Sequence, residues 1–232
     1  MAGFFITGTD TGIGKTWVTL ALMRFLQAKG LSVIGMKPVA SGCVRDDGEL
    51  RNEDAMLLMK NASLSVDYEK LNIYAFEQPV SPHIAALADG KIVNIPTIVE
   101  KCRLLEGLAD CVLVEGVGGW EVPLNAKERV SHLACALKLP VIMVVGMRLG
   151  CLNHAFLTHD AMIRSDVSCH GWIANGIDPD FPCLEENLQT LKSGLSFPCL
   201  GVIPHCTNLD GLGAVNRDEK DFFQGISLRN LA

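Results

Sequence analysis

A glycine-rich segment near the N-terminus constrains the fold more than any other part of the chain. Residues 8–16 read Gly-Thr-Asp-Thr-Gly-Ile-Gly-Lys-Thr and follow a short apolar run over residues 3–7. Apolar residues at helical spacing come next, over residues 18–26. A strand, a glycine-rich turn, Gly-Lys-Thr and a helix are the parts of a phosphate-binding loop, in which backbone N–H groups and a helix N-terminus surround a polyphosphate. Five residues, not the usual four, separate Gly8 from Gly14, so the loop is a variant.

The end of this loop carries two side chains with defined chemistry. Lys15 is placed to reach the β and γ phosphates of a nucleotide, and Thr16 is placed to bind Mg²⁺ through its hydroxyl group. The segment therefore predicts a site for a magnesium-bound nucleotide.

The composition is that of a globular protein and argues against several classes of function. The 232 residues are 49% hydrophobic and 20% charged, which predicts one domain over residues 1–232. A net charge of -6 argues against nucleic-acid binding, and no apolar run reaches membrane-spanning length. Nine scattered cysteines without a Cys-x-x-Cys pair, and an N-terminus without a secretory signal, predict a reduced, cytoplasmic protein.

Short apolar runs alternate with helical patterns along the chain. The runs are apolar at nearly every position, which is typical of strands buried on both faces of a parallel sheet. They cover residues 31–36, 111–114, 140–145, 171–174 and 199–203. Helical patterns lie around residues 53–60, 82–89, 96–108, 127–138, 153–164 and 183–193. This order predicts an α/β fold with a mostly parallel, doubly wound sheet of about six or seven strands and helices on both faces.

The residues that follow each apolar run are candidates for chemistry, because ligands of such sheets bind beyond the carboxyl ends of the strands. Glu115 ends one run, and a carboxylate there can hold Mg²⁺ opposite Thr16. Lys37 ends another run, where a fixed cation would stabilise the charge of a transferred phosphoryl group. A desolvated Lys37 beside Lys15 could also have a lowered pKa and act as a base, so both roles stay open.

Two further positions have both a structural and a functional interpretation. Asp54 lies at the start of a predicted helix, where Asn52 or Asp54 could be only a cap or a first-turn acid, or Asp54 could bind a metal ion. Ser81 precedes Pro82 and is expected to cap a helix, whose N-terminus would bind a carboxylate if it faced the cleft. The sequence alone favours the capping interpretation at both positions.

Six motifs together resemble the dethiobiotin synthetase family, ATP-dependent enzymes of biotin biosynthesis with a P-loop NTPase-like fold. The motifs lie at residues 8–16, 37–42, 51–55, 81–83, 114–120 and 149–154, and the resemblance covers nearly the whole chain. It implies that an amine of 7,8-diaminopelargonate takes up CO₂ as a carbamate, which attacks the γ-phosphate of Mg-ATP. The neighbouring amine then closes the ureido ring on the carbamic-phosphoric anhydride, and ADP and phosphate are released.

The resemblance also implies a role for each matching residue. Lys37 and Lys15 match catalytic lysines, and Thr16, Asp54 and Glu115 match metal ligands. The nucleotide-binding positions are Gly12, Ile13, Gly14, Lys15, Thr16, Trp17, Asp54, Glu115, Gly116, Val117, Gly118, Asn175, Gly176, Pro204, His205 and Cys206. The substrate-binding positions are Thr11, Ser41, Ser81, Gly150, Cys151, Leu152 and Asn153, of which Ser81 and residues 150–153 hold the carboxylate tail. A homodimer is implied, because the family builds this tail site across a dimer interface.

The chain departs from the family pattern at two positions, and two other classes of protein are alternatives. Many family members carry an acid in place of Gly12, and the family varies at His205.

Positioning ATPases have a related loop, but theirs carries a second lysine near its start, and no lysine precedes Lys15 here. Their basic tail is also missing, since residues 218–223 are acidic overall. A small-molecule kinase is the second alternative, and a stable phosphorylated product would distinguish it.

Overall fold

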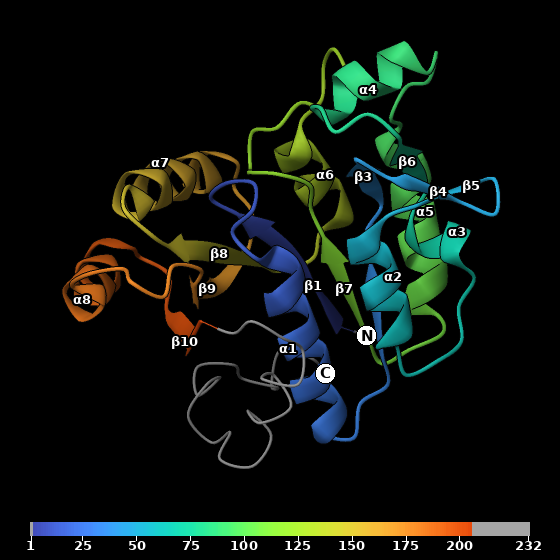
Figure 1. The fold of residues 1–232 in the computed structure, drawn as a ribbon. Helices are drawn as coiled ribbons and strands as arrows, with labels where there is room; N and C mark the ends of the chain where they lie inside the picture. The colour runs from blue at the N-terminus through green and yellow to red at the C-terminus, as the bar shows by residue number, and fades with distance from the viewer. Residues whose placement is uncertain (1, 206–232) are drawn as a thin grey trace.

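The centre of the computed structural model, which describes residues 2–205, is a six-stranded sheet (Figure 1). The strands lie in the order β10-β9-β8-β1-β7-β2, and every neighbouring pair is parallel. Their bounds are β1 Ala2–Gly8, β2 Val33–Met36, β7 Cys111–Glu115, β8 Val141–Met147, β9 Cys169–Gly176 and β10 Cys199–Ile203. The predicted mostly parallel sheet is confirmed.

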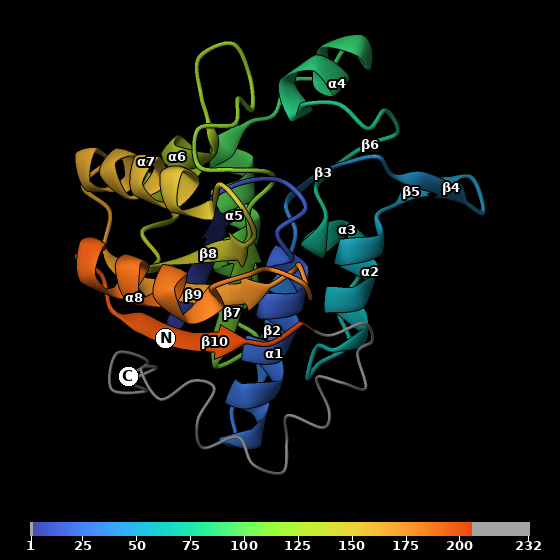
Figure 2. The ribbon, with the colours of Figure 1, turned by 60° about the vertical axis from the view of Figure 1, so that its left-hand side comes forward.

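Helices cover both faces of this sheet, as Figures 1 and 2 show from two directions. On one face, α1 (Lys15–Ala28) and α2 (Glu53–Lys60) pack apolar side chains against the strands. The opposite face is covered by α5 Ile95–Glu106, α6 Val130–Leu137, α7 Cys151–Arg164 and α8 Leu184–Gly194. The two layers make the fold doubly wound, as the order of apolar runs and helical patterns predicts.

Strand β7 shows why the apolar runs do not alternate with polar residues. Cys111 and Leu113 face the layer that contains α1, whereas Val112 and Val114 face the layer that contains α5. All five residues of the strand are buried. A strand covered on both faces needs an apolar side chain at every position, so its sequence forms a continuous apolar run.

Several short strands and one short helix beside the main sheet were not among the predicted elements, whereas the helix predicted over residues 82–89 is present. The strands β3 (Val39–Ser41) and β6 (Tyr74–Phe76) pair in parallel, with α4 (Pro82–Ala88) packed against both. The strands β4 Val44–Asp46 and β5 Glu49–Arg51 form a hairpin, and α3 Tyr68–Leu71 follows α2. The hairpin turn has positive φ at Asp47 and Gly48. An Asp-Gly pair favours such turns, so the sequence held a usable signal for the hairpin.

Two expectations about the environment of the chain can be compared with the described residues. Within residues 2–205, no helix combines the length and the apolar character needed to cross a bilayer. The cysteines of this part of the chain are free thiols, and several are buried. Burial raises the pKa of Cys102, Cys111 and Cys169 to about 12, so these thiols stay protonated and act as small apolar side chains.

Candidate nucleotide and phosphoryl-transfer site

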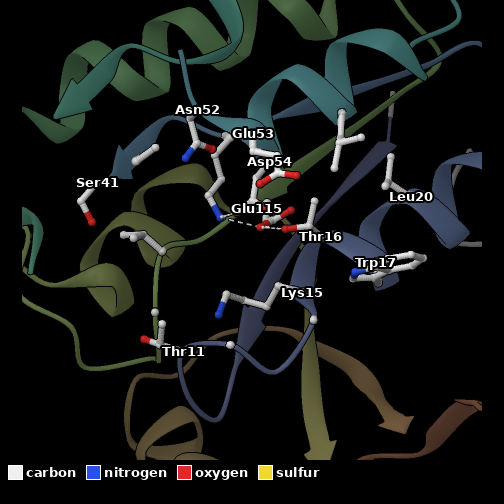
Figure 3. A pocket seen from close by; sticks show the side chains of 17 residues that line it. Thr11, Lys15, Thr16, Trp17, Leu20, Ser41, Asn52, Glu53, Asp54 and Glu115 are labelled. Atoms are coloured by element: carbon white, nitrogen blue, oxygen red, sulfur yellow. Dashed lines mark hydrogen bonds and ion pairs between the residues drawn. The ribbon is translucent and has the colours of Figure 1, made fainter. Parts of the chain in front are cut away.

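A cavity of about 600 Å³ opens at the carboxyl edge of the sheet (Figure 3). Most of the predicted phosphate, metal and diamine residues line it, and these are Thr11, Gly12, Gly14, Lys15, Thr16, Trp17, Lys37, Ser41, Asp54, Glu115, Val117 and Gly118. In Figure 3, Ser41 and Thr11 lie toward one end of the cavity and Trp17 toward the other. The cavity therefore has room for a polyphosphate and for a second molecule beside it.

The phosphate loop depends on Gly14, which stands just before α1. Its φ angle is 77°, in the left-handed region that favours glycine. A Cβ atom at this position would lie 2.2 Å from Nδ2 of Asn175. That amide donates a hydrogen bond of 2.9 Å to the carbonyl of Ile13. Glycine thus lets the end of β9 approach the loop and hold its backbone in place.

Lys15 is buried beside the loop, and its ammonium group donates to the backbone carbonyl of Asp10 at 2.9 Å. Burial, together with the nearby positive charge of Lys37, lowers the pKa of Lys15 to about 8. A protein that buries a cation without a full set of counter-charges is prepared for an anionic ligand. The polyphosphate of a nucleotide would supply that charge.

Lys37 is buried and lies between two carboxylates, of which Glu115 is buried and Asp54 is half-exposed. Its Nζ is 2.5 Å from Oε1 of Glu115 and 3.2 Å from Oδ2 of Asp54, and it also donates to the carbonyl of Gly116 at 3.2 Å. Burial lowers the pKa of Lys37, but the charges of Glu115 and Asp54 outweigh burial and raise the pKa above its ordinary value. The lowered pKa predicted for Lys37 is therefore wrong, and its role as a fixed cation stays a prediction. Of the two lysines, Lys15 has the lowered pKa.

The oxygen atoms around Glu115 form a set that Mg²⁺ would accept. Thr16 Oγ1 donates to Glu115 Oε1 at 2.9 Å, while Oε2 of the same carboxylate is buried without a hydrogen-bond partner among residues 2–205. Asp54 faces the same point across Lys37. Carboxylate and hydroxyl oxygens suit Mg²⁺, which also keeps waters and nucleotide phosphate oxygens as ligands. Within residues 2–205, no group of three or more His, Cys, Asp and Glu side chains is arranged so that it could hold a metal ion.

A second cavity, of about 250 Å³, adjoins the first on the far side of the phosphate loop. It shares Gly12, Gly14 and Trp17 with the first cavity. Its other walls are Asn175, Gly176, Ile177, Ile203, Pro204 and His205, which include the residues predicted for the adenine side. Cys206, also predicted there, lies outside the described residues. The sequence missed Ile177 and Ile203, although both immediately flank predicted positions.

The residues predicted for the carboxylate tail lie elsewhere within the chain. Ser81 occupies the N-cap position of α4, and residues 150–153 begin α7; neither group lines the main cavity. In both ribbon views α4 and α7 lie apart (Figures 1 and 2). The predicted cap is wrong in one respect, because Ser81 makes no capping hydrogen bond and its hydroxyl lies 3.0 Å from Nδ1 of His83 instead.

Asn52 and Glu53 also line the cavity, although sequence reasoning assigned them no binding role. Asn52 does cap α2, as its side chain accepts a hydrogen bond of 3.1 Å from the N–H of Ala55. Asp54, two residues on, faces Lys37. Asn52 therefore has the capping role, and the metal-ligand role of Asp54 stays a prediction.

A parallel sheet with a glycine-rich phosphate loop, and with a lysine between two carboxylates at the same edge, defines a P-loop nucleotide-binding protein. A family model described as an AAA domain matches residues 2–212. The ATP-dependent dethiobiotin synthetase of Cellvibrio japonicus is 48% identical over 87% of this chain and 88% of its own length. The corresponding protein of Xylella fastidiosa is 46% identical over 88% of this chain and 91% of its own length. The chain belongs to the ATP-dependent dethiobiotin synthetase family.

Similar solved structures agree with the P-loop fold. The MinD cell division protein of Aquifex aeolicus has a TM-score of 0.58 at 18% identity and covers 95% of this chain and 91% of its own. A ParA family ATPase of Chlorobium tepidum has a TM-score of 0.55 at 12% identity and covers 95% of this chain and 94% of its own. At these identities the likeness shows the fold alone.

Proposed function

We propose that this chain uses ATP and Mg²⁺ to carboxylate 7,8-diaminopelargonate with CO₂ and to close the ureido ring of dethiobiotin, with release of ADP and phosphate. The observation that carries the proposal is the position of Lys37. It lies between Glu115 and Asp54 in the cavity that also contains the phosphate loop. The membership of the dethiobiotin synthetase family supports the same reaction.

The reaction must bring two anions together, a carbamate and the γ-phosphate of ATP. Fixed cations in a site of low dielectric stabilise this arrangement more than they would in water. Lys15 would contact the β and γ phosphates, and the raised pKa of Lys37 keeps its ammonium charged at neutral pH. A carbamate in free solution reverts to CO₂, so a closed site that excludes water favours the forward reaction.

Magnesium, when bound with the nucleotide, would neutralise phosphate charge and orient the γ-phosphate. Thr16, Glu115 and Asp54 are the residues that would hold it, and the buried unpartnered oxygen of Glu115 supports this assignment. Gly12, Ile13, Gly14 and Trp17 would surround the phosphates with residues 116–118, and Asn175, Gly176, Pro204, His205 and Cys206 would contact adenine. Ser41 and Thr11 would contact the diamine at the other end of the cavity.

The tail of the substrate would reach Ser81 and the backbone of residues 150–153. Because α4 and α7 lie apart in one chain, a homodimer in which one subunit supplies residues 150–153 to the other would complete the site. The exposed side chain of Leu149, 91% accessible, adjoins that segment and supports a contact surface there.

The test is a phosphate-release assay with 7,8-diaminopelargonate, bicarbonate and ATP. We expect phosphate release to require both the diamine and bicarbonate, and mass spectrometry to show dethiobiotin. A stable phosphorylated product formed without bicarbonate would instead indicate a small-molecule kinase. Sedimentation velocity on the same protein would test the dimer, and a monomer with full activity would contradict it.

A further inference from the structure

A buried chain of hydrogen bonds joins the backbone of Lys37 to the start of α2, the helix that carries Asp54. The hydroxyl of Tyr68 accepts a hydrogen bond of 2.7 Å from the N–H of Asn52. It donates to Oδ1 of Asn72 at 2.9 Å, and Nδ2 of Asn72 donates to the carbonyl of Lys37 at 2.6 Å. Tyr68 is 6% exposed and Asn72 is 4% exposed.

One end of this chain of bonds is attached to the segment of Lys37, and the other end to the segment of Asp54. At one end, the N–H of Lys37 also donates to the carbonyl of Leu71, at 3.0 Å. At the other end, Asn52 caps α2. Nζ of Lys37 lies 3.2 Å from Oδ2 of Asp54. The network therefore forms a closed ring through backbone and side chains. The network thus links the backbone of Lys37 to the start of the helix that carries Asp54.

The hydrogen-bond roles in the ring are fixed by chemistry. A tyrosine hydroxyl has one proton, so Tyr68, which accepts from Asn52, must donate that proton to Asn72. Burial raises the pKa of Tyr68, which keeps the proton in place at neutral pH. The Cζ atom of the Arg51 guanidinium lies over the tyrosine ring, 4.2 Å from its centre. Loss of one member leaves a buried polar group without its partner.

We propose that Tyr68 and Asn72 are positioning residues, which set the distance between the Lys37 ammonium and the Asp54 carboxylate for the reaction. Neither residue is among those that line the cavity, so neither would touch a substrate. The proposal rests on the roles proposed above for Lys37 and Asp54. A displacement of a reacting group by about 1 Å can cost roughly 100-fold in rate, so a bond network outside the cavity can matter to turnover.

The chain offers a matched control, because it contains only two tyrosines. Tyr74 also accepts a backbone hydrogen bond through its hydroxyl, from the N–H of Asn94 at 3.1 Å, and its ring stacks on Phe76. We expect Tyr68→Phe to lower kcat by about 10- to 100-fold, and to leave the affinity for a metal-free ATP analogue within about twofold of the original value. Tyr74→Phe removes one hydroxyl of the same kind and should leave kcat unchanged.

A binding measurement separates positioning from a purely structural role. Calorimetry with a non-hydrolysable ATP analogue gives the gain in affinity that Mg²⁺ produces, and this gain should fall in Tyr68→Phe but not in Tyr74→Phe. Asn72→Asp is the second variant. It keeps the acceptor for Tyr68 and replaces the donor to the Lys37 carbonyl with an acceptor. Asn72→Asp should therefore also show a lower kcat and a smaller gain in affinity with Mg²⁺. The double variant should be no worse than either single one, because the bonds act as one unit.

Three results would overturn the proposal. The first is a Tyr68→Phe variant with the kcat and magnesium response of Tyr74→Phe. The second is a lowered melting temperature with unchanged kcat. The third is loss of folding in both Tyr68→Phe and Asn72→Asp, which would assign the network to stability alone. Lys37→Ala and Asp54→Asn, assayed in parallel, test the roles proposed for Lys37 and Asp54. If these two variants retain activity, the proposed roles are wrong. If they lose activity while Tyr68→Phe retains it, only the positioning proposal is wrong.

Discussion

The phosphate end of the site and the tail end differ in how completely a single chain builds them. At the phosphate end, Lys37 and Glu115 are buried, and each makes short polar contacts with groups of the same chain. At the tail end, Ser81 is partly exposed and Gly150 is exposed, and the two lie on helices that are apart. The described residues proposed for the phosphate end meet within one chain, whereas those proposed for the tail end do not.

The difference is consistent with what each end is proposed to bind. Stabilising a polyphosphate and a developing transition state requires cations at fixed places in a low dielectric, and buried strand ends provide this. A single carboxylate needs only a few backbone N–H groups at a helix N-terminus, which a surface can provide. Changes at the phosphate end should therefore reduce turnover or nucleotide binding, and changes at the tail end should raise the KM for the diamine.

The largest effect is expected from Lys37→Ala. The variant would lose the cation that we place beside the transferred phosphoryl group, so kcat should fall by about 10²- to 10³-fold, while an ATP analogue should still bind. Phosphate release and calorimetry measure the two quantities. Lys60→Ala, which removes an exposed lysine at the end of α2, is the control and should match the unaltered protein. Retention of most activity in Lys37→Ala would show that the phosphate end does not depend on this charge.

Gly14→Ala should produce the next largest effect, on nucleotide affinity. A non-glycine residue in the left-handed region costs roughly 1–3 kcal/mol, which is at least about fivefold in an equilibrium constant. The new methyl group would also displace Asn175 from the loop. Calorimetry with an ATP analogue measures the loss.

Gly12→Ala is the matched control for Gly14→Ala. Gly12 also has a positive φ angle, of 71°, but a Cβ atom there meets nothing within 4 Å. Its loss of affinity should be smaller, and the difference between the two variants measures the contact with Asn175. Equal losses would mean that backbone strain explains both.

Asp54→Asn should change the magnesium requirement more than the nucleotide affinity. Loss of one carboxylate charge near the proposed ion should raise the half-saturating Mg²⁺ concentration on the order of tenfold. Glu53→Gln is a suitable control, because Glu53 lines the same cavity but forms no ion pair in the described part of the chain. A magnesium titration of phosphate release distinguishes them. An unchanged titration for Asp54→Asn would return Asp54 to the role of a first-turn acid.

The sequence predicted the convergence of Lys37 and Glu115 beside the phosphate loop, for a physical reason. Parallel strands end at one edge, so Glu115 and Lys37 had to converge near the loop wherever the helices lay. The hydrogen bonds of Tyr68 and Asn72 depend on the path of the chain around a four-residue helix, which leaves no periodic signal. The side chain of Ser81 could not be predicted either, because His83 competes with the helix backbone for its hydroxyl.

The smallest effect is expected from Arg148→Ala, at the junction of the two ends. Arg148 precedes the tail segment and forms an ion pair with Asp10 of the phosphate loop, at side-chain exposures of 44% and 38%. A pair this exposed contributes at most about 1 kcal/mol, so the KM for the diamine should rise by no more than about fivefold. The kcat value and the KM for ATP should stay the same, because Lys15 contacts the backbone carbonyl of Asp10 and not its carboxylate. Arg164→Ala, an exposed arginine at the other end of α7, is the control. If the KM for ATP rose as much as the KM for the diamine, the ion pair would belong to the phosphate end, and the boundary between the two regions would move.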